Sequence, residues 1–297
     1  MNYDMIIVGA GTAGITAGIY ALRSGNKPLI LECEVMGGQI TLSPCVENYP
    51  GIAKISGMEF ADGLMAQLTE LGGEVTYGKV ISAEKTENGF EVRTEDGESY
   101  EGKLLIIASG AAHRHLGVDR EEDLIGKGVS YCAVCDGPFF REKTAAVVGG
   151  GSAALQDALY LAGICKKVYL IHRRDTFRAE KSLVNQVKAT SNIECVMESR
   201  ITALLGEPKL TAVEITNHEG QKQQIEIDGL FVAVGMEPHN EAFAELVDLD
   251  DAGYVIAGED CKTKTPGVYA AGDCRTKSVR QLTTAAADGT VCGLAGR

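Results

Sequence analysis

The chain has 297 residues, 45% of them hydrophobic and 23% charged, so it can bury one large core or two modest ones. This composition excludes a peptide-sized, fibrous or disordered protein. Its 28 Lys and Arg against 41 Asp and Glu give a net charge of −13, which repels phosphate backbones and anionic lipid surfaces. We therefore expect no binding to nucleic acid or to membranes.

The N-terminal segment predicts a βαβ unit. Tyr3 to Val8 is a continuously apolar run, as in a strand buried on both faces, and Ile15 to Arg23 has the composition of a helix. Pro28 to Leu31 is a second strand, which Glu32 follows. Met5 to Leu22 contains no charge, but its glycines and the lack of a preceding Lys or Arg argue against a membrane span or a signal peptide.

The turn of this unit reads Gly9-Ala10-Gly11-Thr12-Ala13-Gly14, a pattern typical of dinucleotide binding. Gly9 permits the tight turn, Gly11 lets a pyrophosphate approach the backbone, and Gly14 lets the helix pack against the strand. The phosphates would meet the positive end of the helix, and Glu32 is placed to bond a ribose hydroxyl. The alternative is a merely structural glycine-rich turn. The N-terminal position of the unit favours FAD.

A second unit repeats the pattern, with a strand at Thr144 to Val148, a helix at Leu155 to Ala162 and a strand at Lys167 to Ile171. Its turn reads Gly149-Gly150-Gly151-Ser152-Ala153-Ala154. Where the first unit has an acid, this one has His172-Arg173-Arg174, with Arg178 close behind. A basic cluster there suits a 2′-phosphate and favours NADP over NAD, although it is also compatible with a solvated basic patch.

Each unit is followed by an apolar strand that runs into glycine, at Leu104 to Gly110 and at Leu230 to Gly235. Alternating polarity and a turn at Asp96-Gly97 predict an antiparallel β segment within Glu74 to Tyr100. Thr211 to Ile227 is a similar segment in the second half. The two halves therefore look like relatives, with a boundary near His113 to Val118.

Cys132-Ala133-Val134-Cys135 has the spacing of an exchangeable disulfide, and Asp136 beside it could trade protons with the thiols. Zinc would need a second ligand pair, which Cys261 and Cys274 do not supply, so no metal site is expected. Nine cysteines, odd in number and scattered, indicate a reducing cytoplasm. We expect the other seven to be small buried hydrophobes: Cys33, Cys45, Cys165, Cys195, Cys261, Cys274 and Cys292. No motif for hydrolysis is present.

Two nucleotide-binding units with a C-x-x-C between them resemble the low-molecular-weight bacterial thioredoxin reductases along essentially the whole chain. Besides the two glycine turns and the cysteine motif, further blocks carry this resemblance: Gly37-Gly38-Gln39, Val46-Glu47-Asn48-Tyr49-Pro50-Gly51, Ala108-Ser109-Gly110-Ala111, Phe177-Arg178-Ala179-Glu180, Gly267-Val268-Tyr269-Ala270-Ala271-Gly272-Asp273 and Arg280-Gln281. The second turn departs from the family at Ser152, Ala153 and Gln156, where Asp or Asn, Ser or Thr, and Glu are common.

The resemblance implies an α/β fold with two Rossmann-like three-layer domains, the second inserted in the first. An FAD domain would comprise residues 1–114 and 240–297, and an NADPH domain with the cysteine pair residues 115–239. Gly37, Gly38, Gln39 and Asn48 would contact the flavin. Asp273, after Gly272, would bind its ribityl chain or pyrophosphate, and Arg280-Gln281 would lie against the isoalloxazine. A helix at Gln281 to Leu294 would favour the reduced flavin's negative charge.

The implied activity is an NADPH-dependent flavoenzyme, a homodimer, that reduces thioredoxin or a thioredoxin-like protein. Electrons would pass from NADPH to FAD, to the disulfide through Cys135, and from Cys132 to the partner's disulfide. One alternative is a related reductase serving a peroxiredoxin or taking electrons from ferredoxin; the basic cluster disfavours ferredoxin, which needs no 2′-phosphate site. Another is a non-catalytic redox sensor that binds FAD.

Overall fold

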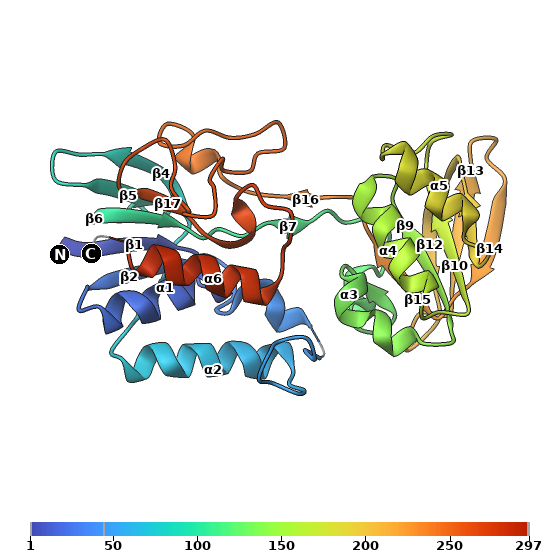
Figure 1. The fold of residues 1–297 in the computed structure, drawn as a ribbon, viewed down its shortest axis with the longest axis horizontal. Helices are drawn as coiled ribbons and strands as arrows, with labels where there is room; N and C mark the ends of the chain where they lie inside the picture. The colour runs from blue at the N-terminus through green and yellow to red at the C-terminus, as the bar shows by residue number, and fades with distance from the viewer. Residues whose placement is uncertain (1, 44, 296–297) are drawn as a thin grey trace. The chain divides into compact units, whose positions relative to one another are not determined.

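The computed structural model describes residues 2–43 and 45–295, and the chain divides into two compact units (Figure 1). Unit 1 comprises the residues up to Ala112 together with those from Glu237 onward. Unit 2 runs from His113 to Met236 and therefore interrupts unit 1 in the chain.

Unit 1 is built on one large sheet with helices against it. Its strands are β1 (Asn2–Val8), β2 (Pro28–Glu32), β3 (Val75–Tyr77), β4 (Val80–Lys85), β5 (Phe90–Thr94), β6 (Ser99–Ile107) and β17 (Val268–Ala270). Its helices are α1 (Thr12–Arg23), α2 (Gly57–Glu70) and α6 (Leu282–Gly293), with short 3-10 turns η1 (Gly38–Leu42), η4 (Glu241–Phe243) and η5 (Gly272–Cys274).

The sheet order is β3-β2-β1-β6-β5-β4, with β17 also paired to β6. β1 is parallel to β2 and β6, whereas β4, β5 and β6 form the antiparallel extension. Alternation along β1 sends Met5 and Ile7 into the core beneath α1, α2 and α6, and Ile6 and Val8 into the core on the opposite face. The three helices are drawn on the same side of this sheet (Figure 1).

Glycines allow α1 and α6 to pack closely. A β-carbon on Gly289 would collide with the carbonyl oxygen of Ala13, and one on Gly293 with that of Ala17. Because both contacts are with backbone atoms, any side chain at either position would push the helices apart. The last helix is thereby held against the helix that follows the first glycine turn.

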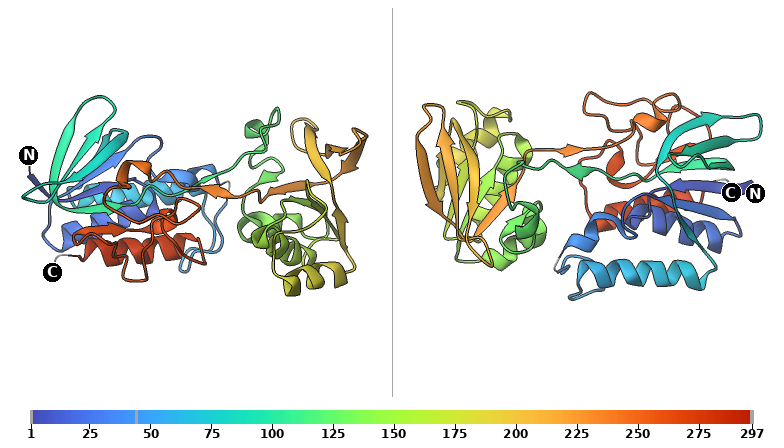
Figure 2. Two further views of the ribbon diagram at one scale, coloured as in Figure 1. Left: turned by 90° about the horizontal axis from the view of Figure 1, so that it is seen from above. Right: turned by 180° about the vertical axis from the view of Figure 1, so that it is seen from behind.

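Unit 2 also has three layers, seen from two further directions in Figure 2. A parallel sheet, ordered β11-β10-β9-β15-β8, comprises β8 (Val129–Ser130), β9 (Thr144–Val148), β10 (Lys167–Ile171), β11 (Ile193–Val196) and β15 (Gly229–Val232). An antiparallel sheet comprises β12 (Ser199–Leu205), β13 (Ala212–Asn217) and β14 (Lys222–Glu226). The helices are α3 (Ala133–Asp136), α4 (Ser152–Ala162) and α5 (Lys181–Ala189), with η2 (Glu122–Leu124) and η3 (Gly137–Phe140).

Alternation along β9 explains the layering of unit 2. Ala145 and Val147 belong to the core that contains α4 and α5, whereas Ala146 and Val148 belong to the core that contains the antiparallel sheet. Both faces of the parallel sheet are therefore covered, as expected for a continuously apolar strand.

The expected α/β fold with two Rossmann-like units is confirmed, and several boundaries need correction. Both glycine-led helices begin about one turn earlier than expected, at Thr12 and Ser152, because a helix continues the glycine turn directly. The strand expected to reach Gly110 ends at Ile107, and the one expected to reach Gly235 ends at Val232. Strand β12 was not expected at all, because the antiparallel segment was placed only from Thr211.

The two chain crossings between the units are short strands, β7 (Ala112–His113) and β16 (Met236–Glu237), and they pair with each other. Arg114 donates its backbone N–H to the carbonyl of Gly235 at 3.0 Å, which extends this pairing. Within the described part of the chain, no helix is long and apolar enough to cross a membrane. The uncharged segment Met5 to Leu22 is divided between β1 and α1.

Candidate functional site

The three glycines of the unit 1 turn have different surroundings. Gly9 has a φ of +108°, and a β-carbon there would collide with the carbonyl oxygen of Ala108. A β-carbon on Gly14 would collide with the carbonyl oxygen of Gly9, so this glycine permits close packing of the helix. A β-carbon on Gly11 would point into open space, with the Gly37 oxygen as its nearest neighbour at 3.9 Å. The turn therefore leaves room where a phosphate would approach.

The N-terminus of α1 can bind an anion at this turn. Gly11 is the N-cap, and among the described residues no side chain caps this end and no acid lies in the first turn. Thr12 and Ala13 are buried, so the helix presents backbone N–H groups rather than side chains. These groups and the positive end of the helix dipole favour a phosphate.

Glu32 lies where a ribose would be bound. It is a buried residue at the end of β2, and its Oε2 accepts a hydrogen bond from the N–H of Ala10 at 2.6 Å. Its Oε1 accepts from the N–H groups of Cys33 and Glu34 at 2.9 and 2.8 Å. These donors fix the carboxylate beside the glycine turn, and because Oε1 accepts two of the three hydrogen bonds, Oε2 is the oxygen that keeps a lone pair for a hydroxyl.

The Gly37-Gly38-Gln39 segment also lies against the first turn. Gly37 donates its N–H to the carbonyl of Ala10 at 2.7 Å. A β-carbon on Gly38 would lie 3.1 Å from the α-carbon of Gly11. Gln39 Nε2 donates to the carbonyl of Ala111 at 2.6 Å, which ties the segment to the chain beyond β6.

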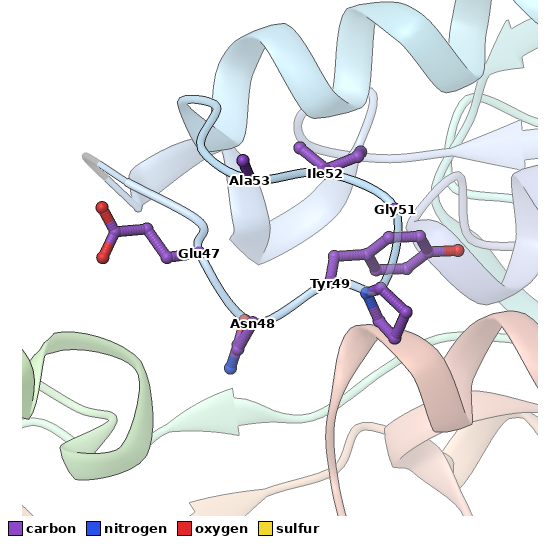
Figure 3. Close-up of a pocket in the computed structure, with 7 residues that line it drawn as sticks. Glu47, Asn48, Tyr49, Gly51, Ile52 and Ala53 are labelled. Carbon is purple, nitrogen blue, oxygen red and sulfur yellow. The ribbon is translucent and has the colours of Figure 1, made fainter.

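The structure brings Asn48 and Gln281 together although 233 positions separate them. Asn48 Nδ2 donates to Gln281 Oε1 at 3.2 Å, and Gln281 is the N-cap of α6. The loop from Glu47 to Ala53 lines a cavity of about 560 Å³, shown in Figure 3. This hollow is open to solvent, and it includes Asn48, one of the residues predicted to contact the flavin.

Asp273 carries an unused acceptor in the same unit. Its Oδ1 is buried and has no hydrogen-bond partner among the described residues. Burial raises the pKa of Asp273, and the cationic groups of Lys277 and Arg280 oppose that rise. The preceding Gly272 packs so closely on α1 that a β-carbon would lie 2.9 Å from the Ala13 side chain. Because buried polar atoms are usually hydrogen-bonded, the Oδ1 of Asp273 is suited to accept a hydrogen bond from a ligand hydroxyl beside the glycine turn.

Arg280 lies next to this acid. Its Nε donates to the carbonyl of Asp273 at 3.5 Å, and its guanidinium lies 4.2 Å from the centre of the Tyr254 ring. All the residues predicted for FAD therefore lie in unit 1, and the open turn, Glu32 and the orphan oxygen of Asp273 fit a dinucleotide.

The glycine turn of unit 2 reproduces these features. Gly149 has a φ of +156°, and a β-carbon there would collide with the carbonyl oxygen of Ala233 and crowd Ala154. Gly151 is the N-cap of α4 and has nothing within 4 Å of its β-carbon position. No side chain among those described caps this helix, and no acid lies in its first turn, which starts at Ser152. This turn can also accept phosphates.

The fold holds the arginine cluster beside this turn. Arg178 donates its N–H to the carbonyl of Gly150 at 2.7 Å and forms a parallel bridge with Gly151. Arg173 and Arg178 are exposed and Arg174 is half-buried. Within residues 2–43 and 45–295, no carboxylate oxygen lies within 4.0 Å of these three guanidinium groups. Their charge is thus available to an anionic ligand.

His172 does not contribute to the positive charge of this cluster. It is buried, its Nε2 lies 3.1 Å from the carbonyl of Thr176, and its ring stacks on Phe177. Burial and the neighbouring arginines lower its pKa, so it is neutral at pH 7. A β-carbon on Gly150 would collide with its ring. His172 therefore supports the turn by packing, and the positive charge comes from the arginines.

Cys132 and Cys135 form a disulfide at the start of α3. Both are half-buried, and the Cys135 N–H donates to Cys132 Sγ at 3.2 Å. Asp136 follows directly, and burial raises its pKa. Its Oδ1 is buried without a hydrogen-bond partner in the described part of the chain. A redox-active pair therefore has a partly desolvated acid beside it.

The remaining cysteines correct one expectation. Cys45, Cys165, Cys261, Cys274 and Cys292 are buried, as expected, but Cys33 is exposed and Cys195 is half-buried. Cys33 follows the last residue of β2, at the strand end where the chain turns outward. No group of ligands that could hold a metal ion is found among the described residues.

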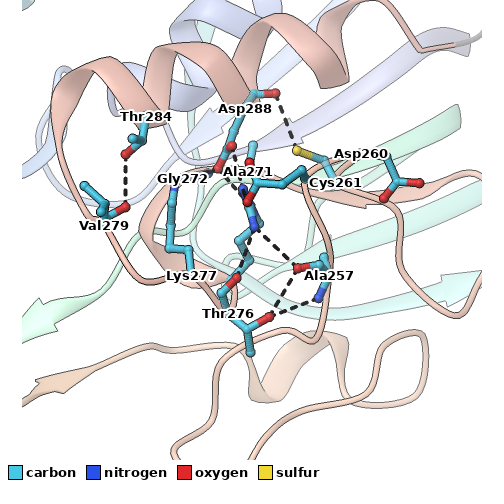
Figure 4. A network of polar contacts seen from close by, with 12 residues as sticks. Ala257, Asp260, Cys261, Ala271, Gly272, Thr276, Lys277, Val279, Thr284 and Asp288 are labelled. Atoms are coloured by element: carbon cyan, nitrogen blue, oxygen red, sulfur yellow. Dashed lines mark hydrogen bonds and ion pairs between the residues drawn. The ribbon is translucent and has the colours of Figure 1, made fainter.

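A buried ionic network, which the sequence did not suggest, fixes the Asp273 segment (Figure 4). Asp288 on α6 accepts hydrogen bonds from Gly272 N–H at 2.9 Å and from Arg275 and Lys277 at 2.8 to 2.9 Å. The three ionic side chains are only 1 to 6% exposed. The sequence signal that could have revealed it is a single acid in an otherwise uncharged helix.

Replacing Asp288 by alanine is expected to destabilise the protein by about 3–5 kcal/mol, because the buried Lys277 loses its partner and the buried Arg275 keeps only the exposed Glu259, at 3.5 Å. Urea unfolding measures the change. The control is Asp248→Ala, which removes an exposed ion pair with Lys264 and should cost less than about 1 kcal/mol. Equal losses in the two variants would contradict this role.

Burial by itself raises the pKa of Asp288, but hydrogen bonds from Arg275, Lys277 and Gly272 outweigh it, and the pKa lies below its ordinary value. The stability contributed by Asp288 is therefore present above the pKa of an unfolded aspartate. It should be lost as the pH falls through the lower, folded value.

The comparisons with known proteins agree with this geometry. The model of the pyridine nucleotide-disulphide oxidoreductase family matches residues 3–289. The chain belongs to this family, whose members are flavoproteins.

Within it, the chain is similar to thioredoxin reductases. It is 39% identical to the thioredoxin reductase of Listeria monocytogenes, covering 99% of this chain and 92% of that one. The crystal structure of thioredoxin reductase from Streptococcus pyogenes has a TM-score of 0.93 at 41% identity, covering 98% and 96% of the two chains. The thioredoxin reductase of Giardia duodenalis has a TM-score of 0.93 at 34% identity, covering 99% and 97%. The chain is thus one of the low-molecular-weight thioredoxin reductases, which use FAD and NADPH.

Proposed function

We propose that this protein reduces the disulfide of thioredoxin, or of a thioredoxin-like protein, with electrons from NADPH. The observation that carries the proposal is the Cys132–Cys135 disulfide, beside the half-buried acid Asp136, in the same unit as a glycine turn flanked by unpaired arginines. Unit 1 would hold FAD and unit 2 NADPH. Bound FAD supplies the two-electron chemistry between the nicotinamide and the disulfide.

Each group of residues has a separate task in this proposal. Arg173, Arg174 and Arg178 bind the 2′-phosphate of NADPH, and the open turn at Gly151 takes its pyrophosphate. In unit 1, Glu32 binds a ribose hydroxyl. The orphan Oδ1 of Asp273 accepts a cofactor hydroxyl, or donates to it when the acid is protonated.

The sulfurs of Cys132 and Cys135 have different roles in the thiol chemistry. Cys132 attacks the partner's disulfide, because the Cys135 N–H that bonds its sulfur also stabilises a thiolate there. Cys135 is then the sulfur that exchanges with the flavin side. Burial raises the pKa of Asp136, which favours its protonated form, and this acid holds the proton that balances a thiolate.

Two further features belong to the proposal. Five of the seven cysteines outside the Cys132–Cys135 disulfide are buried, which supports a reducing compartment such as the cytoplasm. The resemblance to the thioredoxin reductases supports a homodimer that binds neither nucleic acid nor membrane.

One anaerobic titration tests the function. NADPH added to the FAD-loaded protein should bleach the flavin absorbance, and oxidised thioredoxin should restore it. Bleaching by reduced ferredoxin but not by NADPH would favour the ferredoxin-linked reductase. Bleaching by NADPH that a peroxiredoxin-linked disulfide reverses, and thioredoxin does not, would indicate the peroxiredoxin reductase. A flavin that no disulfide substrate re-oxidises would indicate a redox sensor.

A further inference from the structure

Ser130 joins the redox-active cysteines to the neighbouring acid. It is the last residue of β8, which pairs with β15, and it is only 5% exposed. Its Oγ donates to Asp136 Oδ2 at 2.7 Å and accepts the Cys132 N–H at 3.1 Å. The carbonyl of Cys132, at 3.4 Å from the same hydroxyl, is a longer alternative acceptor.

This arrangement makes the two oxygens of Asp136 different. Oδ2 is occupied by the Ser130 hydroxyl, whereas Oδ1 is buried with no partner among the described residues. A hydroxyl has a single proton to donate. While Ser130 donates it to Oδ2, the proton of a neutral Asp136 is favoured on Oδ1.

We propose that Ser130 is a positioning residue for the disulfide exchange, which directs the acidic proton of Asp136 to Oδ1. The proposal rests on the proposed function, in which Asp136 holds a proton for the thiol chemistry. Ser130 acts through Asp136, to which its hydroxyl is bonded, and not on a reacting atom itself. Strand β8 holds the backbone of Ser130 in place, because β8 pairs with β15 in the parallel sheet.

The bonds, electrons and protons of the disulfide exchange balance when Asp136 Oδ1 carries one proton. When the Cys132–Cys135 dithiol is oxidised by a partner disulfide, one S–S bond forms in this chain and one breaks in the partner. Two electrons pass to the partner's sulfurs, which leave as a dithiol after taking two protons from the cysteine pair. Asp136 Oδ1 can hold one of these protons and deliver it to the sulfur that would otherwise leave as a thiolate.

The surroundings of Asp136 determine how a pH profile is read. Burial raises the pKa of Asp136, and the Ser130 hydrogen bond opposes that rise. The elements packed on α3 are η3 and α4, whose titratable side chains are Asp157 and Tyr160 of α4. Burial raises the pKa of Asp157 to about 6. Tyr131, on the same segment as Asp136, donates to Glu121 at 2.7 Å.

The test is Ser130→Ala in the FAD-loaded protein, with NADPH and thioredoxin as substrates. Without the hydrogen bond, the pKa of Asp136 rises further, so the alkaline limb of kcat should move to higher pH. The rate on the plateau should fall about tenfold, because the proton is no longer directed to Oδ1. Bleaching of the flavin by NADPH should keep its wild-type rate, and Ser130→Thr, which keeps the hydroxyl, should restore the wild-type profile.

Two controls separate this role from general damage. Ser199→Ala removes an equally buried hydroxyl of unit 2, bonded to the carbonyl of Met197, and should leave the pH profile unchanged. Asp157→Asn should also leave the alkaline limb in place. In an Asp136→Asn background, Ser130→Ala should have almost no further effect, since both changes remove the same proton placement.

The outcomes distinguish the two hypotheses. If the wild-type protein does not reduce thioredoxin, the proposed function fails. If the wild-type protein does reduce thioredoxin, two results would show that the positioning role is wrong. One is a wild-type pH profile in Ser130→Ala. The other is an equal loss of rate from Ser130→Ala in the wild-type and in the Asp136→Asn background. If Ser130→Ala does not fold, failure of Ser130→Thr to show the wild-type profile would overturn the proposal.

Discussion

Replacing Cys132 by serine is expected to lower thioredoxin reduction at least about a thousandfold, while NADPH still bleaches the flavin. The half-buried Cys132 sulfur accepts the Cys135 N–H at 3.2 Å, and a serine oxygen there is no nucleophile at pH 7. Hydride transfer from NADPH precedes the thiol steps and does not use this sulfur. Stopped-flow absorbance and a thioredoxin turnover assay measure the two half-reactions separately.

The matched control is Cys195→Ser. Cys195 is a half-buried, unpaired cysteine of β11 in the same unit, and its replacement should leave turnover at the wild-type level. Thiol titration after reduction gives an independent readout, because the wild-type protein gains two thiols from its disulfide and Cys132→Ser gains none. Normal thioredoxin turnover by Cys132→Ser would show that another cysteine meets the partner.

Replacing both Arg173 and Arg174 by glutamine is expected to raise the KM for NADPH about a hundredfold and to leave that for NADH nearly unchanged. A charge-assisted hydrogen bond contributes about 1.5–3 kcal/mol. These arginines are partly solvated, so the lower value applies to each, and about 3 kcal/mol for the pair corresponds to about a hundredfold. Only NADPH has the 2′-phosphate that such contacts recognise.

Steady-state kinetics with both nucleotides test the assignment. Arg200→Gln changes an exposed arginine of β12, away from the glycine turn in the sequence, and should affect neither KM. Equal losses with NADPH and NADH in the double variant would falsify a 2′-phosphate site at these arginines. The cluster would then be a solvated basic surface.

Local sequence rules predicted both nucleotide-binding units because each rule acts over a few residues. An apolar run such as Thr144 to Val148 is compatible with a strand buried on both faces, and the structure has β9 at those residues. Gly9 was predicted to permit a tight turn, and it adopts a φ of +108° that favours glycine. Short or half-exposed elements such as β12 and β8 carry too weak an apolar pattern for this reasoning.

The site was only partly predictable for a related reason. Its motif residues, such as Glu32 and Asp136, stand at fixed short spacings from a turn or a cysteine. Ser130 also lies close to the cysteines, but a serine at the end of a strand has no distinctive pattern. Its link to the acid beside the cysteines is seen only in the structure, as a hydrogen bond to Asp136 at 2.7 Å.

The sequence by itself determined the class of fold, the two dinucleotide turns and the redox-active cysteine pair, because backbone geometry and thiol spacing follow from neighbouring residues. Only the tertiary structure decided which distant groups meet. It joined Asn48 to Gln281 and buried Asp288 against Arg275. It also buried His172, which the sequence had placed in the basic cluster, so that its pKa is lowered and its ring packs against Gly150. Burial and long-range contacts fix the charge and partners of a side chain, and both arise only when the chain is packed.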